Sequence, residues 1–153
     1  MIYNHALKLN SSKYLHINKN LIPTGRFKNI KKSIHDFSNF ENIGKKLDYF
    51  KNKKINIKFK GFDTTFVVKK NTRKLVGTLK NNNTNIQVDF FSNLPGVQLY
   101  SAQNLNYKKK LFPYQGICLE TQYFPDAPNK KNFPSTLIKL NKRYTCFTKI
   151  KIN

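Results

Sequence analysis

The chain has 153 residues, of which 39% are hydrophobic and 14% aromatic, so it is long and apolar enough for one domain with a packed core and is not a disordered segment. Its 29 Lys and Arg against 7 Asp and Glu give a net charge of +22. No apolar run approaches the roughly 20 residues of a membrane-spanning helix, and residues 1–10 lack the basic-then-apolar order of a signal peptide. We therefore expect a cytoplasmic protein without a membrane contact.

Apolar and polar residues alternate with a period of two along most of the chain, which is typical of half-buried strands. This pattern predicts an all-β, antiparallel β-sandwich that forms a single domain over residues 1–153. A turn is predicted at Pro23-Thr24-Gly25, and one or two helical turns at 44–50. The later elements follow in chain order: strands at 55–60, 85–90, 117–122 and 146–152, with turns at 80–83, at 95–96 and in the proline-rich loop after Gln122.

The segment from Gly116 to Thr136 joins a strand pattern that carries Glu120 to a loop stiffened by three prolines. On the period-two phase, Glu120 points away from the face that Ile117 and Leu119 occupy. If the Glu120 face lines a cleft, partial desolvation favours the neutral acid and suits this carboxylate to general-base catalysis. Otherwise Glu120 is a solvated strand residue paired with a lysine.

Two further polar side chains stand at the ends of strand patterns. Asp63 follows a glycine bend and either accepts two sugar hydroxyls or caps its own turn. Gln98 points opposite to its apolar neighbours, and its amide can both donate and accept. Together with Glu120, and with Tyr100, Tyr123 and Phe124 nearby, these groups are what a carbohydrate-binding cleft requires.

Four segments, in the same order, resemble motifs of the aldose 1-epimerases, the galactose mutarotase family. They are Tyr14-Leu15 with Leu21-Ile22-Pro23-Thr24-Gly25, Gly61-Phe62-Asp63, Leu94-Pro95-Gly96-Val97-Gln98-Leu99-Tyr100, and residues 116–136 with their Leu-Glu-Thr-Gln, Phe-Pro-Asp, Pro-Asn and Phe-Pro-Ser-Thr runs. The resemblance implies the family's galactose mutarotase-like β-supersandwich, of which the chain resembles only the C-terminal half.

By this resemblance Glu120 matches the catalytic base, Asp63 a hydroxyl-binding acid and Gln98 a substrate-contacting amide. The implied reaction interconverts the α and β anomers of hexoses such as galactose or glucose. The base takes the proton from the anomeric hydroxyl while a histidine protonates the ring oxygen, and the opened sugar rotates about C1–C2 before it closes from the other face. These proton transfers need no cofactor.

The chain departs from the family's pattern in two ways. Thr64 stands where the family commonly has a histidine. The family's catalytic histidine and second substrate-binding histidine both belong to the N-terminal half, so a separately encoded N-terminal half is an expected partner. His5 fits a later, noncatalytic histidine of the family, and neither His16 nor His35 matches the acid. The alternative function is a noncatalytic carbohydrate-binding or vestigial half-domain.

The basic charge has two interpretations. It either reflects binding of a polyanion or the amino acids that AT-rich codons favour, since Lys, Asn, Ile, Phe and Tyr are abundant here. The lysines are spread along the chain, and arginine, the residue best suited to phosphate and guanine contacts, occurs only three times. We favour the second interpretation and expect no specific nucleic-acid partner.

The two cysteines, Cys118 and Cys146, lie in separate strand patterns and have no partner ligands at the spacing of a metal site. They predict a reduced, buried pair and no metal.

Overall fold

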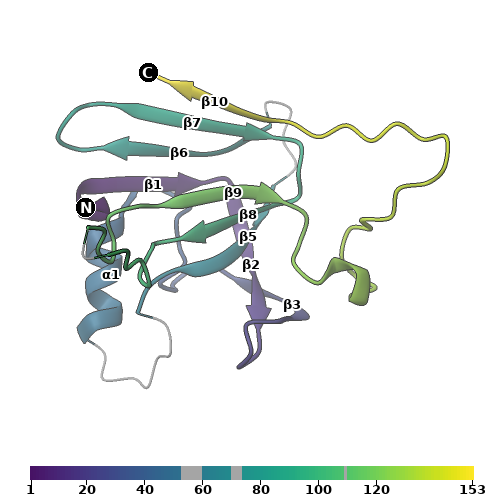
Figure 1. Ribbon diagram of the computed structural model, residues 1–153, viewed down its shortest axis with the longest axis horizontal. Helices are drawn as coiled ribbons and strands as arrows, with labels where there is room; N and C mark the ends of the chain where they lie inside the picture. The colour runs from purple at the N-terminus through teal and green to yellow at the C-terminus, as the bar shows by residue number, and fades with distance from the viewer. Residues whose placement is uncertain (53–59, 70–73, 109) are drawn as a thin grey trace.

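The computed structural model describes residues 1–52, 60–69, 74–108 and 110–153, and their strands form two antiparallel sheets (Figure 1). Sheet 1 has the strand order β10 (Thr148–Ile152), β7 (Gln87–Ser92), β6 (Leu75–Asn81), β1 (His5–Leu9) and β4 (Glu41–Asn42). Sheet 2 has the order β3 (Pro23–Asn29), β2 (Ser11–Ile17), β5 (Asp63–Val68), β8 (Gly96–Tyr100) and β9 (Cys118–Gln122). The helical elements are η1 (Ile2–Asn4), α1 (Ile43–Asn52) and η2 (Ala127–Asn129).

The hydrophobic core lies between the two sheets. Strand β1 turns the alternate residues Leu7 and Leu9 toward sheet 2, whose Phe66 and Leu99 join them in one cluster, and all four are at most 2% exposed. Asn10 alone joins β1 to β2, so the chain passes directly from one sheet to the other. The inner face of each sheet therefore packs on the other.

Helix α1 closes one end of this core. Its buried Ile43 and Leu47 are four residues apart and so lie on one face. The side-chain Oδ1 of Asn42 accepts a hydrogen bond of 2.9 Å from the N–H of Lys45, which satisfies a donor of the first turn. With this cap the helix reaches 10 residues and exceeds the one or two turns predicted at 44–50.

The prediction of an all-β, antiparallel sandwich is confirmed. Strands β7 and β9 lie on the patterns at 85–90 and 117–122, and the β6–β7 turn begins at the predicted place. The pattern at 55–60 falls, apart from Lys60, outside the described residues. No helix in the described part of the chain has the length and hydropathy that a membrane crossing requires.

Two predictions were wrong. Pro23-Thr24-Gly25 is not a turn but the start of β3; a proline is tolerated there because it is the first residue of an edge strand. The turn precedes it, where Leu21 has a φ of 66°. Cys146 lies before β10 and is exposed, and Cys118 is half-buried, so these free cysteines do not form a buried pair.

Candidate active site

Strands β5, β8 and β9 bring the three predicted site residues onto the outer face of sheet 2. In the strand register Gln98 lies directly between Thr65 of β5 and Glu120 of β9. Asp63 is two residues before Thr65, so its side chain is on the same face of β5. The site therefore runs across three neighbouring strands, with the Asp63 carboxylate at one end and the Glu120 carboxylate at the other.

The amide of Gln98 is held at both of its polar atoms. Its Nε2 donates a hydrogen bond of 2.6 Å to Oδ1 of Asp63, and its Oε1 accepts one from the hydroxyl of Thr65. Because a flipped amide would place acceptor against acceptor at Asp63, these two bonds fix its orientation. Sequence reasoning missed Thr65. The sequence feature that could have identified Thr65 is its position two residues after Asp63, which places both side chains on the same face of a strand.

A small pocket of about 150 Å³ opens beside Asp63 and Gln98. Its lining comes from all four segments that resemble the mutarotase motifs: Leu21 and Pro23, Asp63, Gln98, and Pro125, together with Ile17 and Thr65. Segments far apart in the sequence thus meet at one place on the molecule. The pocket combines a carboxylate and an amide with apolar walls, which is the composition of a site for a small polar ligand.

An aromatic cluster holds the proline-rich loop against the outer face of sheet 2. Phe124 and Phe133 are 5% and 7% exposed, and their rings lie 5.1 Å apart beside the ring of Phe27. A Cβ at Gly96 would approach the Phe124 ring to 3.0 Å, so any other residue at this position of β8 would require the ring to shift. Asn132 adds a hydrogen bond of 2.6 Å to the carbonyl of Gly25. The cluster thereby fixes Pro125 at the pocket.

This packing corrects the expected role of Phe124. We expected Tyr100, Tyr123 and Phe124 to offer aromatic faces to a sugar, but Phe124 is buried under the loop and supports it from below. Tyr100 is directly opposite Asp63 on β8 and shares the outer face of sheet 2. The Tyr123 ring packs at 6.4 Å from the ring of Tyr144, outside the pocket lining.

Glu120 is exposed, unlike Asp63 and Gln98, which are half-buried. The described residues therefore do not enclose Glu120 in a cleft. The alternative, a surface ion pair with a lysine, is not found either: none of the ion pairs between described residues includes Glu120. Strand β9 is the last strand of sheet 2, and Glu120 sits in its middle with one open side.

None of the histidines lines the pocket in the described part of the chain. His5 begins β1 in sheet 1, where its Nε2 is 3.4 Å from Asn81, in keeping with the noncatalytic role expected for it. His16 bonds the hydroxyl of Thr24 through Nδ1 at 2.9 Å. The centre of the His35 ring lies 4.2 Å from that of Tyr14, and the two rings are tilted by 34°. Burial, and then nearby Lys46 and Lys28, lower the pKa of His35 to about 4.

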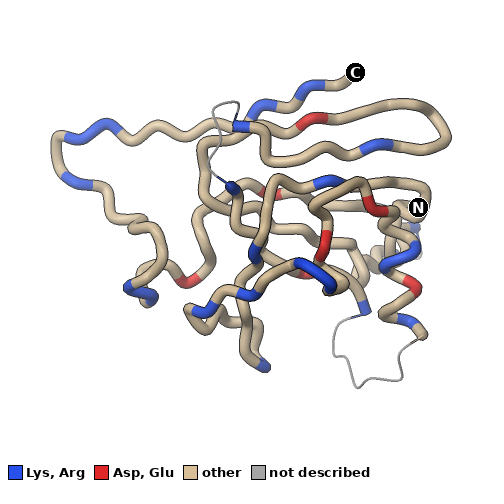
Figure 2. The backbone as a smooth tube through the Cα atoms, turned by 180° about the vertical axis from the view of Figure 1, so that it is seen from behind, with Lys and Arg blue, Asp and Glu red and all other residues tan. Residues whose placement is uncertain are grey.

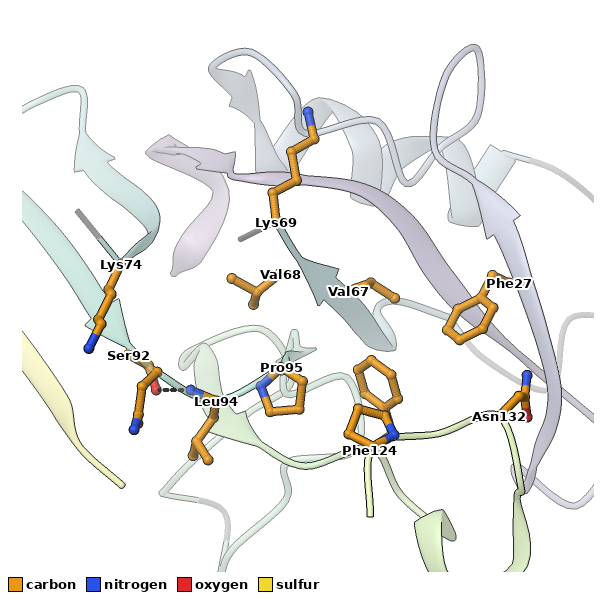
Figure 3. A pocket seen from close by; sticks show the side chains of 12 residues that line it. Phe27, Val67, Val68, Lys69, Lys74, Ser92, Leu94, Pro95, Phe124 and Asn132 are labelled. Carbon is orange, nitrogen blue, oxygen red and sulfur yellow. Dashed lines mark hydrogen bonds between the residues drawn. The ribbon is translucent and has the colours of Figure 1, made fainter. Parts of the chain in front are cut away.

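A larger hollow of about 480 Å³ lies at the other end of β5, and its lining does not include Asp63, Gln98 or Glu120 (Figure 3). Phe27 and Phe124 lie on one side of it and Lys74 on the opposite side, and Lys69 follows Val68 at the end of β5 between them. A hydrogen bond of 3.1 Å from the N–H of Leu94 to Ser92 shapes its floor. Its walls are mainly apolar, and its polar lining residues are Lys69, Lys74, Ser92, Asn93 and Asn132.

Figure 2 shows the Lys and Arg residues of the described part of the chain spread over strands, the helix and loops. The dispersed placement agrees with the spread of lysines along the sequence.

The sequence family described as aldose 1-epimerase matches residues 1–151. The chain belongs to the aldose 1-epimerase family. Relatives include the galactose mutarotases of Sus scrofa and Homo sapiens, which are 27% and 28% identical over 150 residues. Each of these matches covers 94% of this chain but only 42% of the relative. The aldose 1-epimerase of Escherichia coli is 24% identical over 140 residues, 87% of this chain and 40% of its own.

Solved structures of the family show the same fold. An aldose epimerase homologue from C. elegans superposes with a TM-score of 0.80 at 19% identity, over 98% of this chain and 45% of its own. A galactose 1-epimerase from Lactobacillus acidophilus superposes with a TM-score of 0.71 at 20% identity, over 99% and 44%. The expected mutarotase-like fold is therefore confirmed, and the chain spans less than half the length of these relatives.

Proposed function

We propose that the protein is an aldose 1-epimerase that interconverts the α and β anomers of hexoses such as galactose or glucose, and so serves hexose metabolism. The observation that carries this proposal is the meeting of four separate motif segments at one pocket on the outer face of sheet 2. Membership of the family supports the isomerase class, since several relatives are named galactose mutarotase.

In this proposal Asp63 and Gln98 bind sugar hydroxyls. Asp63 Oδ1 accepts the bond from Gln98, which leaves Oδ2 lone pairs to accept from a hydroxyl. Gln98 Nε2 has a second hydrogen that can donate to a sugar oxygen. Thr65 acts as a positioning residue, because its hydroxyl holds the amide of Gln98 in the orientation that directs Nε2 toward the sugar and Asp63.

Glu120 is the proposed base. It pairs with Gln98 across two neighbouring strands, and such pairs have Cβ atoms about 5 Å apart, so both side chains reach one hexose. Glu120 takes the proton of the anomeric hydroxyl, an acid gives a proton to the ring oxygen, and the bond between C1 and the ring oxygen breaks to leave the open aldehyde. Rotation about C1–C2 and the reverse proton transfers then give the other anomer.

The proposed acid is not one of this chain's histidines, since the pocket lining contains none of them among the described residues. We assign it to the N-terminal half of the family's fold, which would also enclose Glu120. The resemblance of the motifs to the C-terminal half of the family supports this assignment, as does the coverage of only 42% of the mammalian relatives.

Polarimetry of freshly dissolved α-D-galactose tests the proposal. The rate is measured with the chain alone and with an added fragment of the pig galactose mutarotase. The fragment is the part of that protein that this chain does not match. We expect mutarotation above the buffer rate in the presence of the fragment. Glu120→Gln should lower the rate by about 10²- to 10⁴-fold, the usual range for a general base. The other glutamate supplies the control: Glu41→Gln, in β4 of sheet 1, should keep the rate. No rate above buffer, or equal losses in both variants, would contradict the proposal.

A second candidate is a noncatalytic sugar-binding half-domain. The exposure of Glu120 favours it, because the described chain does not enclose this carboxylate against a bound sugar. This candidate predicts galactose binding that depends on Asp63 and Gln98, with no mutarotation under any condition and with no effect of Glu120→Gln on binding.

A further inference from the structure

The strand ladder beside Asp63 ends in a side chain instead of a backbone group. Strands β5 and β8 run side by side (Figure 1), and in their register Asp63 is opposite Tyr100. Phe62 and Ser101 continue this register, and the N–H of Ser101 donates a hydrogen bond of 3.0 Å to the carbonyl of Phe62. The N–H of Phe62 donates to the hydroxyl of Ser101, at 2.8 Å. The serine hydroxyl thus takes the place that a backbone carbonyl has in a regular ladder.

The position of Asp63 depends on this last pair of bonds. In an antiparallel ladder, pairs that exchange hydrogen bonds alternate with pairs that do not. Phe62 and Ser101 form a bonded pair, so the next pair, Asp63 with Tyr100, has no ladder bond of its own. The pairs of β2 with β5 lie further along the strand. On its N-terminal side, the backbone of Asp63 is therefore held to the sheet by the bonds between Phe62 and Ser101.

The Ser101 hydroxyl is itself oriented by Gln103. Ser101 is fully buried and Gln103 is 7% exposed. The hydroxyl donates a hydrogen bond of 2.8 Å to Oε1 of Gln103, which leaves its lone pairs for the N–H of Phe62. A Cβ at Gly61 would come too close to the Ser101 hydroxyl and would lie 2.9 Å from Oε1 of Gln103. The glycine before Phe62 therefore lets the backbone lie directly against these two polar side chains.

Gln103 makes this bond although its own burial is unfavourable. Its Nε2 is buried and has no hydrogen-bond partner in the described part of the chain. A buried donor without a partner destabilises the folded state, and an apolar side chain of similar shape would avoid that loss. The stability of the fold therefore does not account for a glutamine at this position, whereas its bond to Ser101 does.

The segment before Asp63 is anchored at two further points. The hydroxyl of Tyr114 donates a hydrogen bond of 2.7 Å to the carbonyl of Lys60. The ring of Phe62 is fully buried, with its centre 5.2 Å from that of Phe37. The chain is thus fixed through both its backbone and a side chain up to the residue before Asp63.

We propose that Ser101 and Gln103 are positioning residues of the sugar site on sheet 2. This inference rests on the proposed function and adds the residues that hold its hydroxyl-binding acid in place. The Ser101 hydroxyl, oriented by Gln103, fixes the backbone before Asp63. The Asp63 carboxylate then stays 2.6 Å from Nε2 of Gln98, with its other oxygen free for a sugar hydroxyl. Neither Ser101 nor Gln103 lines the pocket, so both act through Asp63.

NMR of the ¹⁵N-labelled chain without sugar tests the positioning. The side-chain amide of Gln98 is the probe, because its Nε2–H resonance depends on the short bond to Asp63. Ser101→Ala should move this resonance. Ser92→Ala is the matched control and should leave it unchanged. Ser92 is also buried, at 3% exposure, and also accepts a backbone hydrogen bond, of 3.1 Å from Leu94, but it belongs to sheet 1.

Galactose titration of the same variants gives the second readout. Ser101→Ala should weaken binding about tenfold and Ser92→Ala should keep the native affinity, although urea unfolding should show that both lower the stability. Gln103→Met keeps the approximate shape of the side chain and removes the unpaired donor. It should therefore be at least as stable as the native chain, yet move the Gln98 resonance and bind galactose about three- to fivefold more weakly. This variant decides the test if Ser101→Ala does not fold.

The proposal is overturned if the Gln98 resonance stays in place in Gln103→Met and in any folded Ser101→Ala. It is also overturned if galactose binds to the native chain and equally tightly to Gln103→Met, or if Ser101→Ala and Ser92→Ala lose the same affinity. A native chain that does not bind galactose, with a Gln98 resonance that moves in Gln103→Met but not in Ser92→Ala, would contradict the proposed function and support the positioning of Asp63.

Discussion

The pocket on sheet 2 and the edge formed by β9 and β10 are built in opposite ways. At the pocket, Asp63 and Gln98 are bonded to each other and a packed loop covers the sheet. At the edge, isoleucine side chains and backbone groups are exposed, and Glu120 stands in the open. Under the proposed function, the pocket carries sugar recognition, whereas enclosure of the proposed base, Glu120, depends on what covers the edge.

The sharpest test of this contrast compares one aromatic residue at the pocket with one apolar residue at the edge. Phe124→Ala should lower the free energy of unfolding by about 3 kcal/mol, because it empties a buried site under the loop. Ile150→Ala should cost less than about 1 kcal/mol, because its side chain is 59% exposed. Urea unfolding at pH 7 measures both values. Equal costs would show that the pocket is no better packed than the edge.

His35 tests whether the two regions unfold together. In the unfolded chain its pKa returns to the ordinary 6.5, so between pH 6.5 and 4 the unfolded chain takes up a proton that the folded chain excludes. Stability therefore decreases as the pH falls through this window. Between pH 7 and pH 4.5 the free energy of unfolding drops by about 2 kcal/mol. The transition should shift equally for probes in sheet 1 and sheet 2.

His35→Phe should remove this part of the pH dependence and keep the packing against Tyr14 and Phe66. The difference in the free energy of unfolding between the variant and the native chain is measured at pH 7 and at pH 4.5. Because both proteins have the same carboxylates, this difference isolates the contribution of His35 to the pH dependence. If the free energy of unfolding depended on pH in the same way in His35→Phe and in the native chain, the buried, neutral state of His35 would be ruled out.

A smaller effect is expected from the hydroxyl that orients Gln98. Thr65→Val should weaken galactose binding by about five- to tenfold, roughly 1 kcal/mol, because the amide loses one of the two bonds that fix it. Thr65→Ser keeps the hydroxyl and should keep the affinity. Both are read from binding constants, with stability measured beside them. A Thr65→Ser variant as weak as Thr65→Val would point to packing instead of orientation.

The period-two pattern was sufficient to predict the fold class, strands such as β9, and the face on which Glu120 lies. It was not sufficient for features that depend on contacts distant in sequence. Pro23 opens an edge strand although its neighbours read as a turn, and Phe124 packs under a loop because Gly96, on another strand, leaves room for its ring. The exposure of Glu120 depends on which strand lies at the edge, and strand order cannot be obtained from local periodicity.

The site residues were predicted from the motif resemblance, and the structure brings all three of them to one face. Thr65 was overlooked because a threonine in a strand is common, and its role appears only once the register places it opposite Gln98. Roles in binding and catalysis for Asp63, Gln98 and Glu120 remain predictions.

Galactose titration of the ¹⁵N-labelled chain, followed by two-dimensional NMR, tests the central claim most directly, because it needs no partner. The account predicts saturable shifts for Asp63, Thr65 and Gln98 and for the nearby Leu21, with loss of the shifts in a Gln98→Ala variant. It also predicts that the amides around Ile150 stay unchanged. Shifts centred on the hollow beside Lys69 and Lys74, or no shifts at the highest soluble galactose concentration, would contradict it.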